Sequence, residues 1–111
     1  MNWIDLNDEN QLKSLKELSK QKAQLIFKHS TRCSISSMAK SRLERSSPPE
    51  SIDFYYLDLI KHRHLSQKIA EDFAVYHESP QVLLIKDGKC VYEESHSGIQ
   101  MDDITEQALN S

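Results

Sequence analysis

Hydrophobic residues follow two different spacings in the first part of the chain. In residues 7–22, leucines recur at helical spacing among charged and polar residues, which predicts an amphipathic helix with Asn7 or Asp8 as its N-cap. Residues 23–29, AQLIFKH, form an apolar run that is too short for a helix and suits a buried strand. The chain is therefore expected to begin with a helix followed by a strand.

The next helix is predicted to start at about Cys33 and to end before the SSPPES segment at 46–51, because proline cannot continue a helix. Residues 52–60, IDFYYLDLI, are rich in aromatic and β-branched side chains and predict a second strand. The apolar face of the predicted helix is expected to consist of Ile35, Met38, Ala39 and Leu43.

Two further helices are predicted in the second half of the chain. In residues 63–75, apolar side chains stand four positions apart, which indicates a helix that covers the sheet. Gly98 then interrupts the chain, and residues 101–110 predict a closing helix capped by Asp102 or Asp103.

Between these helices lies the clearest hairpin. The runs QVLLIK (81–86) and CVYEES (90–95) are joined through Asp87 and Gly88, a pair that suits a tight turn with positive φ. Helices and strands alternate up to this point, so the earlier strands are expected to pair in parallel and the hairpin to add antiparallel strands. The sequence predicts an α/β fold, with a mixed four-stranded sheet flanked by helices, in one domain spanning residues 1–111.

Composition and charge exclude several classes of function. The 111 residues carry a net charge of −3, which gives no basic field for nucleic acid or an anionic membrane. No apolar run approaches the ~18 residues of a membrane span, and the N-terminal sequence lacks the regions of a signal peptide. We therefore expect a cytoplasmic protein that binds neither nucleic acid nor membranes.

The chain has two cysteines, Cys33 and Cys90, which lie far apart and form no disulfide framework. Cys33 is expected where a strand gives way to a helix, at the positive end of the helix dipole and near unsatisfied N–H groups. Both features favour the nucleophilic thiolate. Thr31 and Ser36 could support that thiolate by hydrogen bonds, and Arg32 by its charge. The alternative is a small buried hydrophobic residue.

A second signal stands before the predicted 81–86 strand, where Ser79 is followed by Pro80. Proline is tolerated at the start of a strand, and an X–Pro bond in this position suits a cis peptide. A cysteine at a helix start, combined with a proline before an antiparallel hairpin, is a known arrangement.

That arrangement resembles the thioredoxin fold, a three-layer sandwich in which a cysteine at a helix start faces a cis-proline loop. The segment FAVYHESPQVLLIKDGKCV (73–91) is similar to the corresponding thioredoxin segment. The closer resemblance is to the bacilliredoxin family of the YtxJ type, in FKHSTRCSIS (27–36) and YHESPQVLLIKDGK (76–89). That family's usual pattern is Thr-Cys-Pro-Ile-Ser, from which Arg32 and Ser34 depart.

The resemblance implies a monothiol thiol–disulfide oxidoreductase that removes bacillithiol from protein mixed disulfides. Cys33 would be the catalytic nucleophile, and Ser36 in place of a second cysteine fits a one-cysteine cycle that an external thiol completes. Ser79, Pro80 and Gln81 would form the substrate-binding loop, with Gln81 either touching the ligand or facing solvent. No bound cofactor or metal is implied. Bacillithiol is the thiol co-substrate, and S-thiolated proteins are the partners.

Several alternatives stay open. Cys90 is expected to be a strand residue without a redox role, although it could also complete the exchange in place of the external thiol. His29 and His77 flank the two loops and either tune the thiol or serve in packing. Two other functions compete: a redox-quiet thioredoxin-like binding or general stress-response module, and a glutathione-type glutaredoxin with an iron–sulfur cluster, whose glycine-rich loop is absent here.

Overall fold

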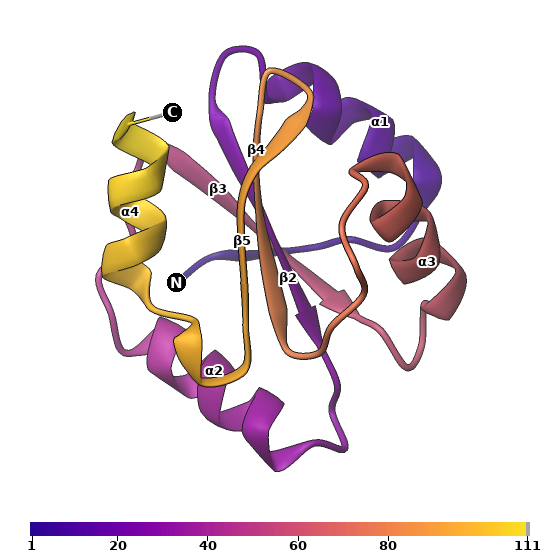
Figure 1. The fold of residues 1–111 in the computed structure, drawn as a ribbon, viewed down its shortest axis with the longest axis vertical. Coiled ribbons are helices and arrows are strands. Elements are labelled where there is room, and N and C mark those ends of the chain that lie inside the picture. Colours follow the sequence, from indigo (N-terminus) through magenta and orange to yellow (C-terminus); the bar gives the residue numbers. More distant parts are fainter. Residues whose placement is uncertain (111) are drawn as a thin grey trace.

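The computed structural model describes residues 1–110, which form a mixed five-stranded sheet covered by helices on both faces (Figure 1). The elements in chain order are β1 (Trp3–Asp5), α1 (Glu9–Leu18), β2 (Ala23–His29), α2 (Ser34–Glu44), β3 (Ile52–Asp58), α3 (Arg63–Asp72), β4 (Gln81–Lys86), β5 (Lys89–Ser95), the 3-10 helix η1 (His96–Gly98) and α4 (Met101–Asn110). The α/β class and the mixed sheet are confirmed.

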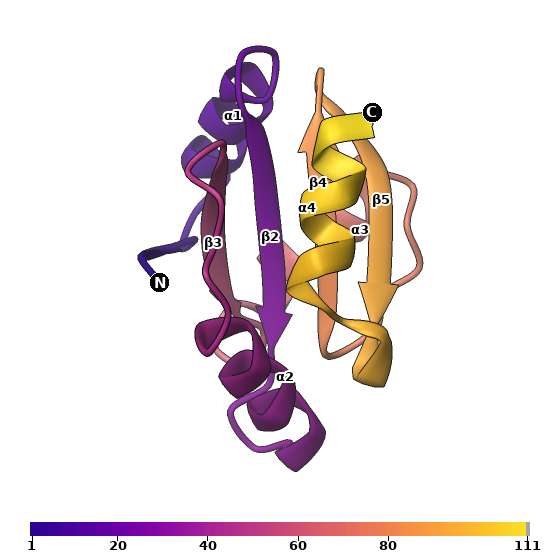
Figure 2. The same cartoon turned by 90° about the vertical axis from the view of Figure 1, so that its left-hand side faces the viewer.

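The strands lie side by side in the order β1-β3-β2-β4-β5 (Figure 2). β1, β3 and β2 pair in parallel, whereas β4 is antiparallel to both β2 and β5. The predicted count of four strands is wrong by one, because the sheet also contains β1. A strand of three residues has too few positions to show an alternation of its own. It forms because its backbone pairs with β3, with Trp3 opposite Phe54.

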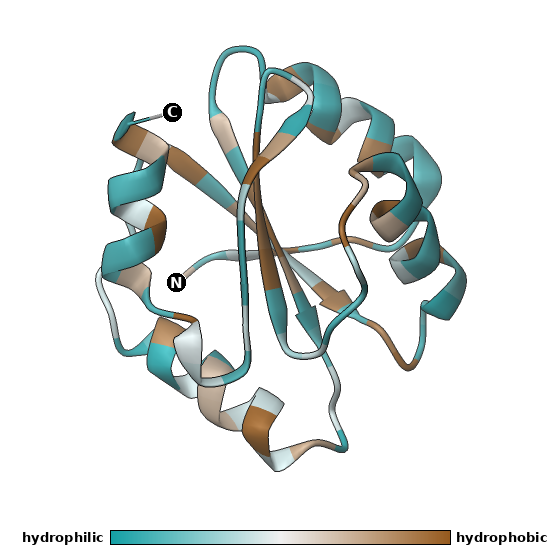
Figure 3. Cartoon of the chain, viewed as in Figure 1, coloured by the Kyte–Doolittle hydropathy of each residue, from teal (hydrophilic) through white to brown (hydrophobic). Residues whose placement is uncertain are grey.

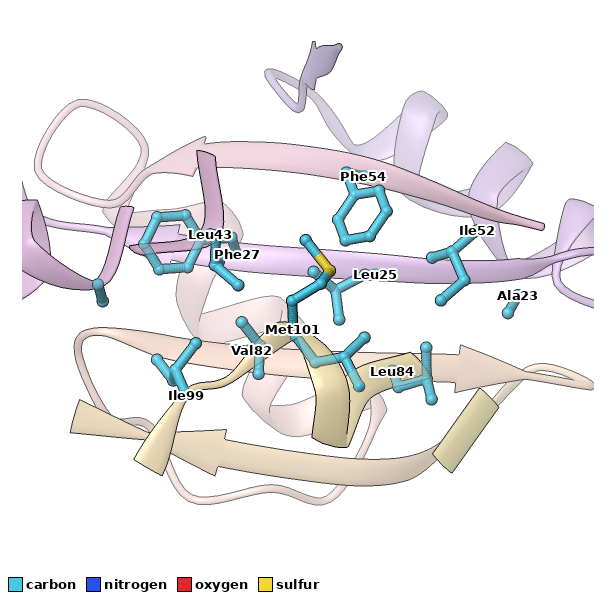
Figure 4. Close-up of a cluster of buried hydrophobic side chains, with 12 residues drawn as sticks. Ala23, Leu25, Phe27, Leu43, Ile52, Phe54, Val82, Leu84, Ile99 and Met101 are labelled. Atoms are coloured by element: carbon cyan, nitrogen blue, oxygen red, sulfur yellow. The ribbon is translucent and has the colours of Figure 1, made fainter. Parts of the chain in front are cut away.

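Each face of the sheet carries its own hydrophobic core, since successive residues of a strand point to opposite faces. The middle parts of the central strands β2 and β4 are accordingly apolar, and polar residues stand toward their ends, as the hydropathy colouring in Figure 3 shows. The core under α2 and α4 contains the side chains labelled in Figure 4: Ala23, Leu25, Phe27, Leu43, Ile52, Phe54, Val82, Leu84, Ile99 and Met101. The core under α1 and α3 is built from Leu6, Leu12, Leu15, Ile26, Tyr55, Leu57, Leu65, Ile69, Phe73, Leu83 and Ile85.

The buried face of α2 differs from the predicted one. Ile35 and Met38 are 52% and 64% exposed, whereas Ala39 and Leu43 are buried as expected. Ser36 takes the inward position, because its hydroxyl finds polar partners at the end of β2. The inward face of α2 therefore combines a polar contact to the end of β2 with the apolar side chains of Ala39 and Leu43.

Of the predicted helix caps, the one on α1 is confirmed and the one on α4 is wrong. Asp8 caps α1 by accepting a hydrogen bond from Gln11 N at 2.8 Å, one of the two predicted caps. Asp102 and Asp103 do not cap α4: they lie within its first turn, where their charges face the positive end of the helix dipole. None of the helices within residues 1–110 is long and apolar enough to cross a membrane.

The β4–β5 turn has the predicted geometry, with φ of 52° at Asp87 and 75° at Gly88. A Cβ atom added at Gly88 would meet no atom within 4 Å. A side chain there would therefore destabilise the fold only through the unfavourable positive φ, and not through a steric clash. We expect Gly88→Ala to lower the free energy of unfolding by about 1 kcal/mol in urea denaturation, because left-handed backbone disfavours a Cβ atom. Asp87→Asn is the control and should leave stability nearly unchanged, since asparagine tolerates positive φ. Equal stability of Gly88→Ala and the wild type would contradict this account.

Candidate functional site

The pairing of β2 with β4 brings the two predicted site loops to one end of the sheet. The strands are antiparallel, with Lys28 opposite Gln81, so the segment leaving β2 and the segment entering β4 meet at the same edge. The first segment leads through residues 30–33 into α2 (Figure 1), and the second carries Ser79 and Pro80. The Ser79–Pro80 peptide is cis, as predicted.

Cys33 is the N-cap residue of α2, with extended backbone at φ −110° and ψ 122°. Its carbonyl accepts the first helical hydrogen bond from Ser37 N at 3.0 Å, and its own N–H donates to Ser30 O at 3.1 Å. The thiol is half-buried, no side chain caps the helix, and the first turn contains no acidic residue. A thiolate at this position would therefore face the positive end of α2 without a competing carboxylate from that turn.

Ser36 lies one turn further along α2, and its hydroxyl is turned toward β2. The Oγ atom accepts a hydrogen bond from Ser30 N at 3.0 Å and lies 2.7 Å from His29 Nδ1. Ser36 is completely buried, and within residues 1–110 no hydrogen bond joins it to Cys33. The predicted hydrogen bond from Ser36 to the sulfur is thus absent, because the hydroxyl is used to hold the loop that precedes Cys33.

His29 completes this contact from the end of β2. Its ring is 4% exposed and packs at 5.6 Å from the Phe27 ring and 5.5 Å from the Tyr56 ring. Burial, with a contribution from the nearby Lys40 ammonium, lowers the pKa of His29, so the neutral ring is favoured. This placement corresponds to the packing alternative considered for the residue.

Thr31 and Arg32 are both exposed, in the loop between β2 and α2. Neither side chain makes a hydrogen bond or an ion pair within the part of the chain that the structure describes. Their support of a thiolate stays a prediction.

In the second loop, Pro80 and Gln81 are buried, and the Ser79 hydroxyl has no hydrogen-bond partner within residues 1–110. The Gln81 amide donates to Tyr76 O at 3.0 Å and to Glu93 Oε2 at 3.1 Å. Gln81 is therefore not the solvent-facing strand residue of one expectation, and its contact with a ligand stays a prediction. It holds the segment before Pro80 from the inside of the protein.

Sequence reasoning did not single out Lys28, which is completely buried on the α1/α3 face of β2. Its ammonium lies 3.4 Å from Ser66 O and 3.3 Å from His77 Nδ1. Burial lowers the pKa of Lys28 from 10.5 to about 8, with an opposing contribution from Cys90. One signal in the sequence indicates its burial: Lys28 stands two residues after Ile26 in an apolar strand, so both side chains point to the same face of the sheet.

Cys90 lies in β5 near the Asp87-Gly88 turn, at the end of the sheet opposite α2 (Figure 1). Its thiol donates to Tyr92 O at 3.3 Å, and burial raises its pKa. A raised pKa disfavours the thiolate, so this placement agrees with the predicted strand residue remote from the site. Among residues 1–110, no group of three or more His, Cys, Asp or Glu side chains is arranged to hold a metal ion.

Removal of the Ser36 hydroxyl tests its structural role. Ser36→Ala leaves Ser30 N–H and His29 Nδ1 without their partner, so we expect the free energy of unfolding to fall by about 1–3 kcal/mol. Ser37→Ala is the matched control, because Ser37 is exposed on the same helix and should change stability little. If the two variants have equal denaturation midpoints, the hydroxyl does not hold the loop.

Burial of Lys28 has a consequence for the pH dependence of stability. The folded chain releases the proton near pH 8 and the unfolded chain near 10.5, so between these values the unfolded chain binds more protons. The free energy of unfolding should therefore rise with pH in this window, by roughly 2 kcal/mol from this residue. Lys28→Met should remove this rise in urea denaturation at about pH 7.5 and 9.5. Lys61→Met, at an exposed position, should keep it, and parallel pH profiles for wild type and Lys28→Met would refute it.

Comparison with known proteins agrees with this architecture. A solved structure described as having a thioredoxin fold is 29% identical, with a TM-score of 0.78, and the match covers 94% of this chain and 91% of that chain. Thioredoxin from Malassezia sympodialis is 15% identical, with a TM-score of 0.78 and coverage of 96% and 91%. Thioredoxin from Fasciola hepatica is 18% identical, with a TM-score of 0.70 and coverage of 96% of each chain. Residues 4–104 match the family model described as Monothiol bacilliredoxin BrxC, and the chain therefore belongs to the monothiol bacilliredoxin family, thiol–disulfide oxidoreductases with a thioredoxin fold.

Proposed function

We propose that this protein removes bacillithiol from S-bacillithiolated proteins, with Cys33 as the nucleophile. The observation that carries the proposal is the presence of a single thiol at the site: Cys33 at the start of α2, beside the loop with the cis Ser79–Pro80 peptide. Family membership supports thiol redox chemistry at this position.

The first step is a thiol–disulfide exchange. The Cys33 thiolate attacks the bacillithiol sulfur of the mixed disulfide, so a bond forms between these two sulfurs. The bond between the bacillithiol sulfur and the target protein's sulfur breaks, and the target leaves as a thiolate. Cys33 is left bacillithiolated, and the target cysteine is reduced.

The second step needs another thiol, since the chain offers none nearby. The position three residues after Cys33 holds Ser36, whose hydroxyl is bound to His29 and Ser30. Cys90 lies at the opposite end of the sheet. A bacillithiol thiolate would therefore attack the bacillithiol sulfur on Cys33, releasing bacillithiol disulfide and restoring the Cys33 thiolate.

The protein part of the substrate would contact the exposed apolar side chains next to Cys33. Ile35 and Met38, two and five residues further along, are 52% and 64% exposed in the first turns of α2. An exposed apolar surface of this kind suits contact with many different partners, and methionine adapts readily to different shapes.

Intact-mass spectrometry tests the proposal directly. Reduced wild type, Cys33→Ser and Cys90→Ser are incubated at neutral pH with oxidised bacillithiol and, in parallel, with oxidised glutathione. We expect a bacillithiol adduct on wild type and Cys90→Ser and its loss in Cys33→Ser, because only Cys33 lies at a helix N-terminus. Reduced bacillithiol should then remove the adduct.

The controls separate the competing functions. A preference for glutathione would point to a glutaredoxin-type substrate instead of bacillithiol. An adduct retained in Cys33→Ser and lost in Cys90→Ser would show that Cys90 is the reactive thiol and would contradict the proposal. No adduct on any variant would refute the proposal and favour a redox-quiet binding module.

A further inference from the structure

Lys28 is an uncompensated charge inside the protein. Its side chain is completely buried, and its ammonium is not in ion-pair contact with any carboxylate of residues 1–110. Its two contacts, with Ser66 O and His77 Nδ1, are long, at 3.4 and 3.3 Å, and one of its three N–H donors is unused. Buried charges in proteins are normally paired with an opposite charge, whereas this ammonium has no counterion among residues 1–110.

A pocket lies between α3 and the loop that precedes β4, and Lys28 stands behind its wall without lining it. Its volume is about 170 Å³, and two of its lining residues are Ser66 and His77, the two residues that Lys28 contacts. The lining contains a guanidinium and an imidazole but no carboxylate: Leu59, Arg63, Ser66, Gln67 and His77. Arg63 is exposed and makes no ion pair within the part of the chain described.

Carboxylates in neighbouring segments are engaged elsewhere. Asp58 accepts hydrogen bonds from the backbone N–H groups of Ile60 and Lys61. Glu78 lies 3.5 Å from His96, and Glu93 accepts from the Gln81 amide at 3.1 Å. None of these three carboxylates forms an ion pair with Lys28 or Arg63, although the Glu78 carboxylate acts on the His77 ring.

The walls of the pocket continue into the two site loops. Leu59 N donates to His29 O at 3.0 Å, and the His29 ring holds Ser36 of the active-site helix. His77 stands three residues before Pro80 in the same loop. The pocket thus borders the end of β2 through Leu59 and the loop of the cis peptide through His77.

We propose that this pocket is a binding site for a carboxylate group of the low-molecular-weight thiol that reacts at Cys33. The inference rests on the proposed function for the identity of that thiol. The Arg63 guanidinium lines the pocket and matches the fork geometry of a carboxylate. The Lys28 ammonium behind Ser66 and His77 adds an attractive positive charge through the pocket wall. The carboxylate would be held beside α3, while the sulfur of the same molecule reaches the α2 N-terminus.

The test separates binding from exchange chemistry. ¹⁵N-labelled Cys33→Ser protein is titrated with mercaptosuccinate, a small thiol with two carboxylates, and separately with its dimethyl ester. We expect saturable shifts of the Leu59, Ser66 and His77 amide signals with mercaptosuccinate and none with the ester. Because Cys33 is absent, this result is independent of whether the protein transfers bacillithiol.

Variants in the same background locate the site. Arg63→Gln should weaken mercaptosuccinate binding about tenfold, the loss expected for one charged hydrogen-bonding partner. Lys28→Met should also weaken binding, but by less, because its ammonium acts through the pocket wall without touching the ligand. Lys28→Met replaces a buried ammonium by an apolar chain and should remain folded, while Arg63→Gln changes an exposed residue. Lys61→Gln, an exposed cation outside the pocket lining, is the control and should bind as Cys33→Ser does.

Three outcomes would overturn the proposal. These are equal binding of the dimethyl ester, an equal loss of affinity in Lys61→Gln, and tighter binding of inorganic phosphate than of mercaptosuccinate. The first would indicate an apolar contact, the second a general charge effect, and the third a phosphate site. Failure here together with a bacillithiol adduct on Cys33 would leave the proposed function intact and remove only the carboxylate site.

Discussion

The antiparallel pairing of β2 with β4 is the constraint on which the site depends. Both strands are buried, and their register places Lys28 opposite Gln81 at the edge where the chain leaves β2 and enters β4. Because that register is fixed by two apolar cores, a slip by one residue would turn every side chain to the wrong face. The same hydrogen-bond ladder that stabilises the sheet therefore sets the loop of Cys33 beside the loop of Pro80.

Polar side chains inside this frame hold the two loops. Ser36 ties the start of α2 to His29 and Ser30, and Gln81 ties the segment before Pro80 to Tyr76 and Glu93. A buried hydrogen bond adds little net free energy of folding, but a buried polar group left without its partner costs considerably more. Such bonds therefore favour one specific arrangement of the loops. The serine that replaces a second cysteine thus has a structural task in addition to leaving a single thiol.

Lys28 lowers the stability of the fold and, in our proposal, contributes to ligand binding. A buried ammonium without a carboxylate partner costs folding free energy, and an apolar side chain of similar length would avoid that cost. Its neighbours Ser66 and His77 also line the pocket beside α3. The energetic cost of the residue and its contribution to the carboxylate site that we infer would then have the same origin, a buried positive charge behind the wall of the pocket.

The sequence by itself determined the features that depend on neighbouring residues. The residue 23–29 strand, the Asp8 cap and the Asp87-Gly88 turn follow from local spacing and backbone preference, and so does the position of Cys33 at a helix start. Only the tertiary structure decided the pairing of β1, the inward rotation of Ser36 and the burial of Lys28. The partners of β1 and Lys28 are tens of residues away in the chain, and those of Ser36 lie in and just after β2, seven and six residues before it. No pattern within one segment specifies which group outside it will satisfy a polar atom once the cores have packed.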